Sequence, residues 1–359
     1  MAQSSSTVDM EKAQKTAEQV FGLLGGALAS AMIYLGDRLG LYTAMHGADP
    51  VTSDELARKT GLHERWVREW LQGQAAAHLL DYNGDGRFAL SPETALVLAD
   101  ENSPFFLAGG FCALPQQMAI LERLPESFRT GVGLPYDAFG PEGARGIERL
   151  LAPWFRTQLV PVALPKLDGV TAKLDKGAKT ADIGCGGGVA LIELAKRFPR
   201  SEFHGYDISE YALARAEANK SKAGVRNMTV HDARRDLIPG DASFDLITTF
   251  DCIHDMAHPL PVMSAIRKAL KPDGTWLIAD IHGEDSFEKN LANPLAPLLY
   301  GFSVLCCMSS AMSEPNGAGL GTLGFPEGVA RKMTAEAGFT RFKSHDFNNP
   351  INAYYEVRP

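Results

Sequence analysis

The glycine-rich segment Asp182-Ile-Gly-Cys-Gly-Gly-Gly188 constrains the fold more than any other part of this sequence. It ends an apolar run, Thr180–Cys185, that predicts a buried strand, and it precedes Val189–Phe198, whose apolar spacing predicts an amphipathic helix. Glycines between a strand and a helix let the backbone turn sharply and let a ligand approach the main chain. The segment therefore predicts a ligand site at the carboxyl end of a sheet strand.

Strands and helices alternate from Lys179 onward. Apolar runs predict further strands at Glu202–Ile208, Met228–Asp232, Phe244–Phe250 and Thr275–Ile281, and a terminal pair at Phe339–Phe347 and Ala353–Val357. Apolar residues three and four positions apart predict helices at Glu210–Ala223, Pro261–Leu270 and Glu327–Ala337. Apolar strands joined by helices are typical of an α/β fold with a parallel sheet covered on both faces.

The glycine spacing indicates which kind of ligand binds. It is G-x-G-x-G and not the G-x-G-x-x-G of dinucleotide sites, and no phosphate-binding Gly-Lys-Ser/Thr is present. No Lys or Arg lies between Ala181 and Leu191. The following helix could receive a carboxylate at its N-terminus, while Asp182 suits a cationic neighbour. Methionine joined to adenosine through a sulfonium offers both features without a phosphate.

Two further aspartates follow predicted strands. Asp207 ends the second strand, where a carboxylate can accept hydrogen bonds from both hydroxyls of a ribose. Asp232 follows the third strand and is placed to meet an adenine amino group beside the Ala233 backbone. Together with Asp182, these residues predict a nucleoside-containing cofactor.

The N-terminal part has a different organisation. Residues 10–45 read as helix, with an apolar face over Val20–Leu35. Val51–Leu62 has a helix-capping signal and a turn at Gly61, after which a second helix runs through Trp70. Asp81–Gly86 is a hairpin signal before a short strand. Helix, turn, helix and hairpin form the plan of a winged helix. A loop-rich helical connector follows, in which we expect breaks near Gly140, Pro141 and Gly143 and a helix from about Leu150 to Leu167.

Residues 179–281 resemble the core of the class I S-adenosylmethionine-dependent methyltransferases, and the whole chain resembles bacterial and plant-type small-molecule O-methyltransferases with a winged helix. The resemblance implies a seven-stranded Rossmann-like sheet with an antiparallel last strand and S-adenosyl-L-methionine as cofactor. It implies a helical, winged-helix-like dimerisation domain (1–100), a helical connector (101–170) and a methyltransferase domain (171–359). By motif, it assigns cofactor binding to Asp182, Gly184, Cys185, Gly186, Asp207, Ile208, Asp232, Ala233, Phe250 and Asp251.

The fourth strand leads into His254-Asp255, which is similar to the His-Asp pair that supplies the general base in plant-type O-methyltransferases. An imidazole near neutral pKa can take a proton from a hydroxyl that attacks an electrophilic methyl. In the alternative interpretation, Asp255 only caps the helix after Pro259. The plant pattern has Trp after His-Asp where this chain has Met256, and no carboxylate that would orient the imidazole can be located. His258 and His282 are weaker candidates for the base.

The segment 284–325 is an apolar insertion after the fifth strand. Two interpretations remain open: it closes over the site as a lid above a small hydrophobic or aromatic acceptor, or it packs on the N-terminal domain. No charged residue lies between Asn290 and Ser313, and the largely apolar part Leu295–Met312 is close to the length of a bilayer span, but the stretch contains prolines and lies between two strands of one sheet. We therefore expect no membrane span.

The composition limits the classes of partner that this protein is expected to bind. The net charge is −8, so nucleic acid and anionic membranes are not expected partners. The five cysteines show no C-x-x-C spacing and residues 1–20 lack an apolar signal segment, which together indicate the cytoplasm and no metal site. An exposed apolar helix face needs burial, so we expect a homodimer.

Three functions remain to be compared. The first is methyl transfer to a small molecule, with oxygen as the expected acceptor atom, although nitrogen and sulfur stay open. The second is a cofactor-sensing DNA-binding regulator, which the eight acidic and five basic residues between Val51 and Asp100 disfavour. The third is a protein of this fold that binds the cofactor without methylating.

Overall fold

The computed structural model describes residues 8–359, so the first seven residues of the predicted N-terminal domain lie outside the described part. The chain divides into two compact units, Met1–Leu114 and Pro115–Pro359. The first unit is a helical domain with a small hairpin. Its elements are α1 (Met10–Arg38), α2 (Leu41–Met45), α3 (Ser53–Thr60), α4 (Glu64–Ala76), β1 (Asp81–Tyr82), β2 (Phe88–Ala89) and α5 (Pro92–Leu98).

The winged-helix prediction for this unit is confirmed. Thr52 caps α3 and exchanges hydrogen bonds with Glu55 in a capping box, and Gly61 ends the helix in the left-handed conformation at φ +71°. β1 and β2 pair antiparallel. Tyr42 and Trp70 pack edge to face in the core of the unit. The capping and turn residues that indicate this plan in the sequence therefore form the expected local structure.

The predicted helix over residues 10–45 forms two helices, because Gly40 adopts φ +69° between α1 and α2. Along α1, Val20, Phe21, Leu24 and Leu28 are each more than half exposed. Among the described helices, only α1 is long and apolar enough to cross a membrane. A single such helix is weak evidence for a span, because a signal sequence near the N-terminus has the same length and composition. The apolar face of α1 is therefore uncovered within the first unit.

The second unit contains a seven-stranded sheet in the order β5-β4-β3-β6-β7-β9-β8. The strands are β3 (Lys179–Ile183), β4 (Glu202–Asp207), β5 (Met228–Asp232), β6 (Phe244–Phe250), β7 (Leu270–Ile281), β8 (Arg341–His345) and β9 (Asn352–Arg358). All neighbouring strands from β5 to β7 are parallel, and β9 runs antiparallel to both β7 and β8. The predicted α/β fold with an antiparallel last strand is confirmed.

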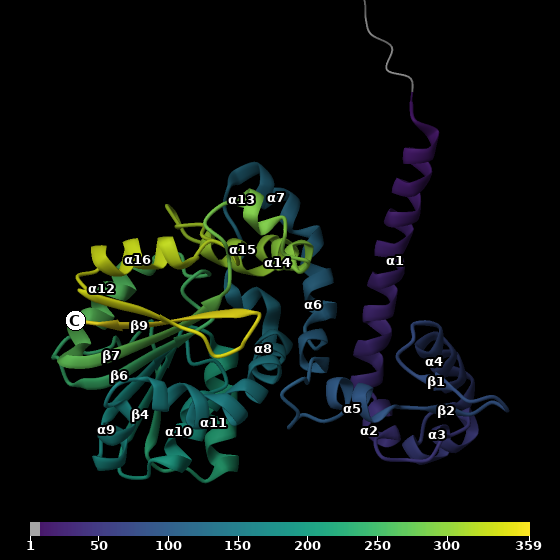
Figure 1. Ribbon diagram of the computed structural model, residues 1–359, viewed down its shortest axis with the longest axis horizontal. Helices are drawn as coiled ribbons and strands as arrows, with labels where there is room; N and C mark the ends of the chain where they lie inside the picture. The colour runs from purple at the N-terminus through teal and green to yellow at the C-terminus, as the bar shows by residue number, and fades with distance from the viewer. Residues whose placement is uncertain (1–7) are drawn as a thin grey trace, which may run out of the picture. The chain divides into compact units, whose positions relative to one another are not determined.

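Helices cover both faces of the sheet (Figure 1). α9 (Val170–Lys176), α10 (Val189–Arg197) and α11 (Glu210–Ala223) lie on one side, and α12 (Pro259–Ala269) and α16 (Glu327–Glu336) lie on the other. Each face has its own apolar core, one around Leu191 and Leu277 and the other around Ile247 and Trp276. Because β3, β4, β5 and β6 run in the same direction, their carboxyl ends meet at one edge, where the predicted site residues gather.

The connector differs from the prediction. Its long helix α8 (Gly140–Trp154) begins ten residues before the expected start, and continues into a π-helix, η4 (Phe155–Ala163). Pro141 occupies the first turn, where its missing N–H costs nothing, and a Cβ on Gly143 would lie 2.6 Å from that of Phe139. Residues read as helix breakers therefore start the helix and allow close packing. Before α8 lie the short helices α6 (Leu114–Ala119) and α7 (Leu124–Thr130).

The insertion 284–325 is a chain of short helices within the second unit. They are α13 (Phe287–Asn290), α14 (Ala296–Phe302), the π-helix η6 (Ser303–Cys307) and α15 (Met308–Ala311). The connector packs directly on α15, because Gly133 N–H donates to Met312 and Leu134 N–H donates to Ser309 Oγ. A Cβ on Gly133 would lie against the Ser309 backbone, so only glycine permits this contact.

Candidate functional site

The glycine loop after β3 lies against two neighbouring strand ends. Gly184 adopts φ +73°, and a Cβ there would lie 2.8 Å from the Cβ and Sγ of Cys252. Gly186 adopts φ +54° and donates its N–H to Asp207 Oδ2 at 2.8 Å, whereas a Cβ at this position would meet no atom within 4 Å. Cys185 between them is buried. The loop thus presents open main chain at Gly186, as a bound ligand would require.

Asp207 joins the glycine loop to the second strand. Its Oδ2 accepts the Gly186 N–H and its Oδ1 accepts the Ser209 N–H, each at 2.8 Å. Burial raises the pKa of this carboxyl, and the backbone hydrogen bonds oppose the shift. Ile208 beside it is 55% exposed. The predicted ribose partner therefore also organises the glycine loop.

Two carboxylates lie at the ends of the central strands, Asp182 fully buried and Asp251 half-buried. Asp182 Oδ1 accepts a hydrogen bond from Thr248 at 2.7 Å, and burial raises the pKa of Asp182 to about 7. Asp251 accepts one from Asn352 Nδ2 at 2.5 Å, and burial, then the nearby Asp280, raises its pKa to about 7. Among the described residues, neither forms an ion pair with a Lys or Arg. A cation bound here would stabilise the charged form of both groups.

The remaining predicted cofactor residues lie around these groups. Phe250 is buried against Phe155 of η4, with ring centroids 4.9 Å apart. Ala233 N–H donates to the Asp207 carbonyl. Arg234 Nε donates a hydrogen bond to Asp232 Oδ1 at 2.9 Å, and this hydrogen bond lowers the pKa of Asp232. The structure thus brings the predicted residues to one edge of the sheet, with Asp232 paired to a basic neighbour that the sequence analysis did not consider.

His254 is buried in the turn after β6, and its Nδ1 lies 2.5 Å from Asp280 Oδ1 at the end of β7. Asp280 is the orienting carboxylate that could not be located in the sequence. The sequence marks Asp280 only as an acidic residue within the apolar strand Trp276–Ile281. Burial opposes protonation of His254, but the charge and hydrogen bond of Asp280, with Cys307 beside it, raise the pKa of the imidazole well above its ordinary value. The Asp280 carboxylate therefore favours the protonated imidazole, an effect that the His-Asp motif alone does not predict.

Asp255 lies next to His254 and is half-buried. Burial raises the pKa of this carboxyl well above its ordinary value. The helix α12 begins at Pro259 with His258 at its N-cap and no side-chain capping bond, so Asp255 does not cap it. The capping interpretation of Asp255 is thus not supported by the local geometry.

The insertion lies directly over His254. Gly321 N–H donates to the His254 carbonyl, and Ala318 N–H donates to that of Ala257. Thr322 N–H donates to Ser303 Oγ at the start of η6, so the same segment also holds this π-helix. Cys307 ends η6 and is half-buried. Sequence reasoning did not single out this cysteine, because it lies more than 50 positions from His254.

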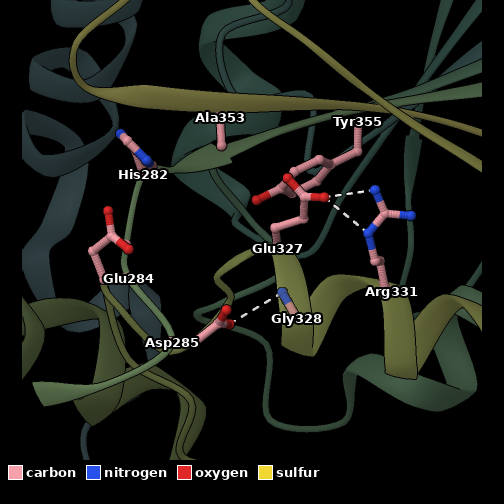
Figure 2. Close-up of a pocket in the computed structure, with 9 residues that line it drawn as sticks. His282, Glu284, Asp285, Glu327, Gly328, Arg331, Ala353 and Tyr355 are labelled. Atoms are coloured by element: carbon pink, nitrogen blue, oxygen red, sulfur yellow. Dashed lines mark hydrogen bonds and ion pairs between the residues drawn. The ribbon is translucent and has the colours of Figure 1, made fainter. Parts of the chain in front are cut away.

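The weaker histidine candidates lie elsewhere. His258 is exposed and pairs with Glu314 at 3.2 Å. His282 lines a separate polar cavity of about 400 Å³ between the end of β7 and α16, shown in Figure 2. Glu327 and Arg331 form an ion pair at one side of this cavity, and Asp285 accepts the Gly328 N–H. None of the predicted cofactor residues lines it, so this cavity is distinct from the site around His254.

Comparisons with known proteins agree with this architecture. Residues 174–299 match the family described as "Methyltransferase domain", and residues 27–100 match the "Rv2258c-like winged HTH domain". The chain is 28% identical over 282 residues to the mitomycin biosynthesis 6-O-methyltransferase of Streptomyces lavendulae, which covers 73% of this chain and 77% of that protein. It is 33% identical over 111 residues to an uncharacterised methyltransferase of Synechocystis, covering 30% of this chain and only 50% of that protein's length.

A solved structure extends the comparison to the whole fold. Human N-acetylserotonin methyltransferase, in complex with S-adenosylmethionine, superposes with a TM-score of 0.70 at 16% identity and covers 99% of both chains. This likeness concerns the fold alone. The chain therefore carries a methyltransferase domain preceded by a winged helix-turn-helix domain.

Proposed function

We propose that this protein transfers a methyl group from S-adenosyl-L-methionine to a hydroxyl oxygen of a small hydrophobic or aromatic molecule. The buried Asp280–His254 pair next to the glycine loop is the observation that carries the proposal. A hydroxyl becomes a good nucleophile when a positioned base removes its proton, whereas a neutral amine needs no such base. The 6-O-methyltransferase named among the relatives supports oxygen as the acceptor atom.

The chemistry of the edge residues fits this cofactor. The open main chain at Gly186 can approach an adenosyl group, and no Lys or Arg of a phosphate site is present in the loop. Asp182 is buried and Asp251 half-buried, and neither forms an ion pair with a Lys or Arg among the described residues, which suits a ligand that carries an ammonium and a sulfonium. Within the proposal, the cofactor is held by the residues predicted from the sequence: Asp182, Gly184, Cys185, Gly186, Asp207, Ile208, Asp232, Ala233, Phe250 and Asp251.

S-adenosylmethionine supplies an electrophilic methyl group when bound. His254 acts as the general base and Asp280 holds its Nδ1, so that Nε2 is the nitrogen turned to the acceptor hydroxyl. The carboxylate stabilises the imidazolium that forms when the proton is taken. Asp255 adds a second acidic group beside this imidazole.

The insertion is the proposed wall of the acceptor pocket. It is bonded to the His254 turn through Gly321, and Leu305 and Met312 contribute half-buried apolar side chains to it. An apolar wall beside a base favours an acceptor with a hydroxyl on an aromatic or aliphatic body. The alternative that the insertion only packs on the N-terminal domain is not needed to explain these contacts.

The oligomeric state and location are part of the same proposal. The exposed apolar face of α1 supports a homodimer, because such a face needs burial. The acidic net charge and the acidic excess between Val51 and Asp100 support the absence of a nucleic-acid partner. We place the protein in the cytoplasm and keep the domain boundaries 1–100, 101–170 and 171–359 as proposed.

The direct test uses a panel of phenols, aliphatic alcohols, amines and thiols with isotopically labelled S-adenosylmethionine, read by mass spectrometry. Label transfer to a hydroxyl compound, lost in His254→Gln, is the expected result. Transfer to amines alone would overturn O-methylation. Binding of S-adenosylhomocysteine without transfer to any compound would favour a non-methylating member of the fold, and specific DNA binding would favour a regulator.

A further inference from the structure

Two histidines and an aspartate form a chain of hydrogen bonds beside the cofactor residues, and the proposed reaction uses none of them. His204 of β4 and His231 of β5 lie on adjacent strands, with His204 Nδ1 3.1 Å from His231 Nε2. The other ring nitrogen of His231, Nδ1, lies 2.5 Å from Oδ2 of Asp236 in the loop after β5. The His231 ring also stacks on that of Tyr206, with centroids 4.5 Å apart. We call Asp236, His231 and His204 the imidazole relay.

The partners of the relay fix where each imidazole carries its proton. A carboxylate only accepts hydrogen bonds, so the proton of His231 is on Nδ1, where it is donated to Asp236. The Nε2 of a neutral His231 is then an acceptor, and His204 must donate to it from Nδ1. This leaves His204 Nε2 without a proton. That atom is buried and has no hydrogen-bond partner in the described part of the chain.

The relay resists a further proton. Every other ring nitrogen of the pair is engaged in a hydrogen bond, so an added proton ends on His204 Nε2 as a buried N–H without an acceptor. Burial, and then the charges of His231 and Lys179, lower the pKa of His204, whereas Glu202 and Asp236 oppose the shift. The titratable and charged groups around the two rings are Lys179 of β3, Glu202 and Tyr206 of β4, Asp236 after β5, and Asp241 before β6.

The relay closes the loop that carries two predicted cofactor residues. Asp232 and Ala233 lie between His231 and Asp236 in the chain. The Asp236 N–H donates to the Asp232 carbonyl, and the Ala233 N–H donates to the Asp207 carbonyl, each at 2.9 Å. The bond from Asp236 to His231 adds a side-chain clamp across the same loop. Because the Asp236 side chain is 62% exposed, its removal deletes this clamp without opening a cavity in the core.

We propose that His231 is a positioning residue for the adenine side of the cofactor site, because the neutral imidazole relay fixes the loop of Asp232 and Ala233. The relay acts through this loop and does not itself touch the ligand. Release of the loop should weaken the expected contact of Asp232 with the adenine amino group. The link to adenine rests on the proposed function, whereas the proton positions in the relay do not.

The first experiment reads the protons directly. Nitrogen NMR of the full chain labelled with ¹⁵N-histidine distinguishes the two tautomers, with signals assigned from His204→Phe and His231→Phe. We expect both imidazoles to carry their proton on Nδ1 at pH 7.5 and His204 to stay neutral below pH 6.5. Asp236→Ala should release His231 to a mixture of tautomers. A proton on Nε2 of either ring at pH 7.5, or ionisation of His204 above pH 6.5, would overturn the relay.

The second experiment compares S-adenosylhomocysteine with S-inosylhomocysteine, which has an oxygen in place of the adenine amino group, by calorimetry. His231→Phe keeps a ring to stack on Tyr206 but removes both nitrogens. We expect this variant and Asp236→Ala to bind S-adenosylhomocysteine about threefold to tenfold more weakly, the range that one hydrogen bond contributes. Their affinity for S-inosylhomocysteine should not change, so both variants lose discrimination between the two ligands.

Two further variants separate positioning from a general structural effect. Asp236→Asn keeps an oxygen that accepts the His231 proton, so it should bind as wild type does. Asp241→Ala is the matched control, because it removes a nearby acidic group that is outside the relay. Equal weakening of both ligands in Asp236→Ala, or no weakening of either, would reject the positioning role. If the wild-type chain itself bound neither ligand, the proposed function would fail, and the NMR result would still decide the relay.

Discussion

Asp280 Oδ1 lies 2.5 Å from His254 Nδ1, and both side chains are buried. This pair joins the ends of β6 and β7, two strands that are adjacent in the sheet although their ends lie about thirty residues apart in sequence. The carboxylate fixes which nitrogen of the imidazole carries the proton. It also favours the protonated ring, so the base is free only above its raised pKa.

The first prediction concerns this pair. The rate of methyl transfer should rise with pH through a group titrating well above 6.5, because the imidazole must lose its proton before it can act as a base. Asp280→Asn removes the anion, so the inflection should move to lower pH while the maximal rate falls. His254→Ala should lower turnover by about 10²- to 10⁴-fold.

The measurement is a pH–rate profile at saturating S-adenosylmethionine, with cofactor affinity checked separately by calorimetry. Both variants should retain that affinity within a few-fold, since neither His254 nor Asp280 is one of the proposed cofactor-binding residues. An inflection at the same pH in Asp280→Asn would contradict the assignment of Asp280.

The second prediction concerns cofactor binding and pH. Asp182 and Asp251 have pKa values raised to about 7 by burial, so both become charged as the pH rises through 7. A cationic ligand prefers the charged carboxylates, and its affinity should therefore fall below pH 7 by up to about tenfold per pH unit for each coupled proton. Calorimetry of S-adenosylmethionine in buffers of different ionisation enthalpy should reveal proton release on binding near pH 6.5.

Asp182→Asn is the matched variant for this effect, because its amide oxygen can still accept the Thr248 hydrogen bond. The folded-state pKa of Asp182 is above the unfolded value, so this group favours folding at low pH and loses that contribution as the pH rises through about 7. The variant should therefore unfold at higher temperature than wild type at pH 8, yet bind the ligand more weakly. Affinity that is independent of pH between 6 and 8 would contradict the prediction.

The third prediction concerns Asp207. Asp207→Ala should weaken S-adenosylmethionine binding at least tenfold, because ribose hydroxyls would lose a charged acceptor worth about 1.5–3 kcal/mol. The same change leaves the Gly186 N–H without its carboxylate partner, so the glycine loop should also loosen. Asp207→Asn keeps one acceptor oxygen, so its affinity for S-adenosylmethionine should lie between those of wild type and Asp207→Ala. Equal dissociation constants for all three proteins in calorimetry would rule out the ribose role.

The fourth prediction concerns α1. Replacing Leu24 and Leu28 with Glu should convert the expected dimer to monomers or aggregates, because both side chains are more than half exposed on the apolar face. The control replaces Gln19 and Gly22 with Glu, which adds the same charge on the opposite side of the helix. Light scattering at micromolar concentration reads the outcome. A monomeric wild-type protein would contradict the dimer.

The parts of the fold that could be predicted are those whose signal is local. Buried strands such as Phe244–Phe250 are continuous apolar runs, and Thr52 with Glu55 marks a helix start within four residues. The sequence predicts a start of α8 that is too late, because proline and glycine occur both in loops and in the first turn of a helix, as Pro141 and Gly143 do here. Local pattern does not separate these two cases.

The site was predictable only in part for a related reason. The glycine loop and Asp207 lie on consecutive strands, so motif spacing finds them. Asp280 and Gly321 meet His254 through the pairing of β7 with β6 and the fold-back of the insertion, which no spacing in the sequence encodes. The raised pKa of His254 follows from that meeting and could not be expected from the His-Asp motif alone.

The position of β9 has a consequence for how the sheet is assembled. β9 follows β8 along the chain but inserts between β7 and β8, so β8 cannot join the sheet until residues 352–358 have been synthesised. Until then, the β7 edge presents unpaired backbone groups to other chains. Asn352, which holds Asp251, arrives with the same strand. On the ribosome, the nascent chain would therefore pass through an aggregation-prone stage that ends at the moment the site itself is completed.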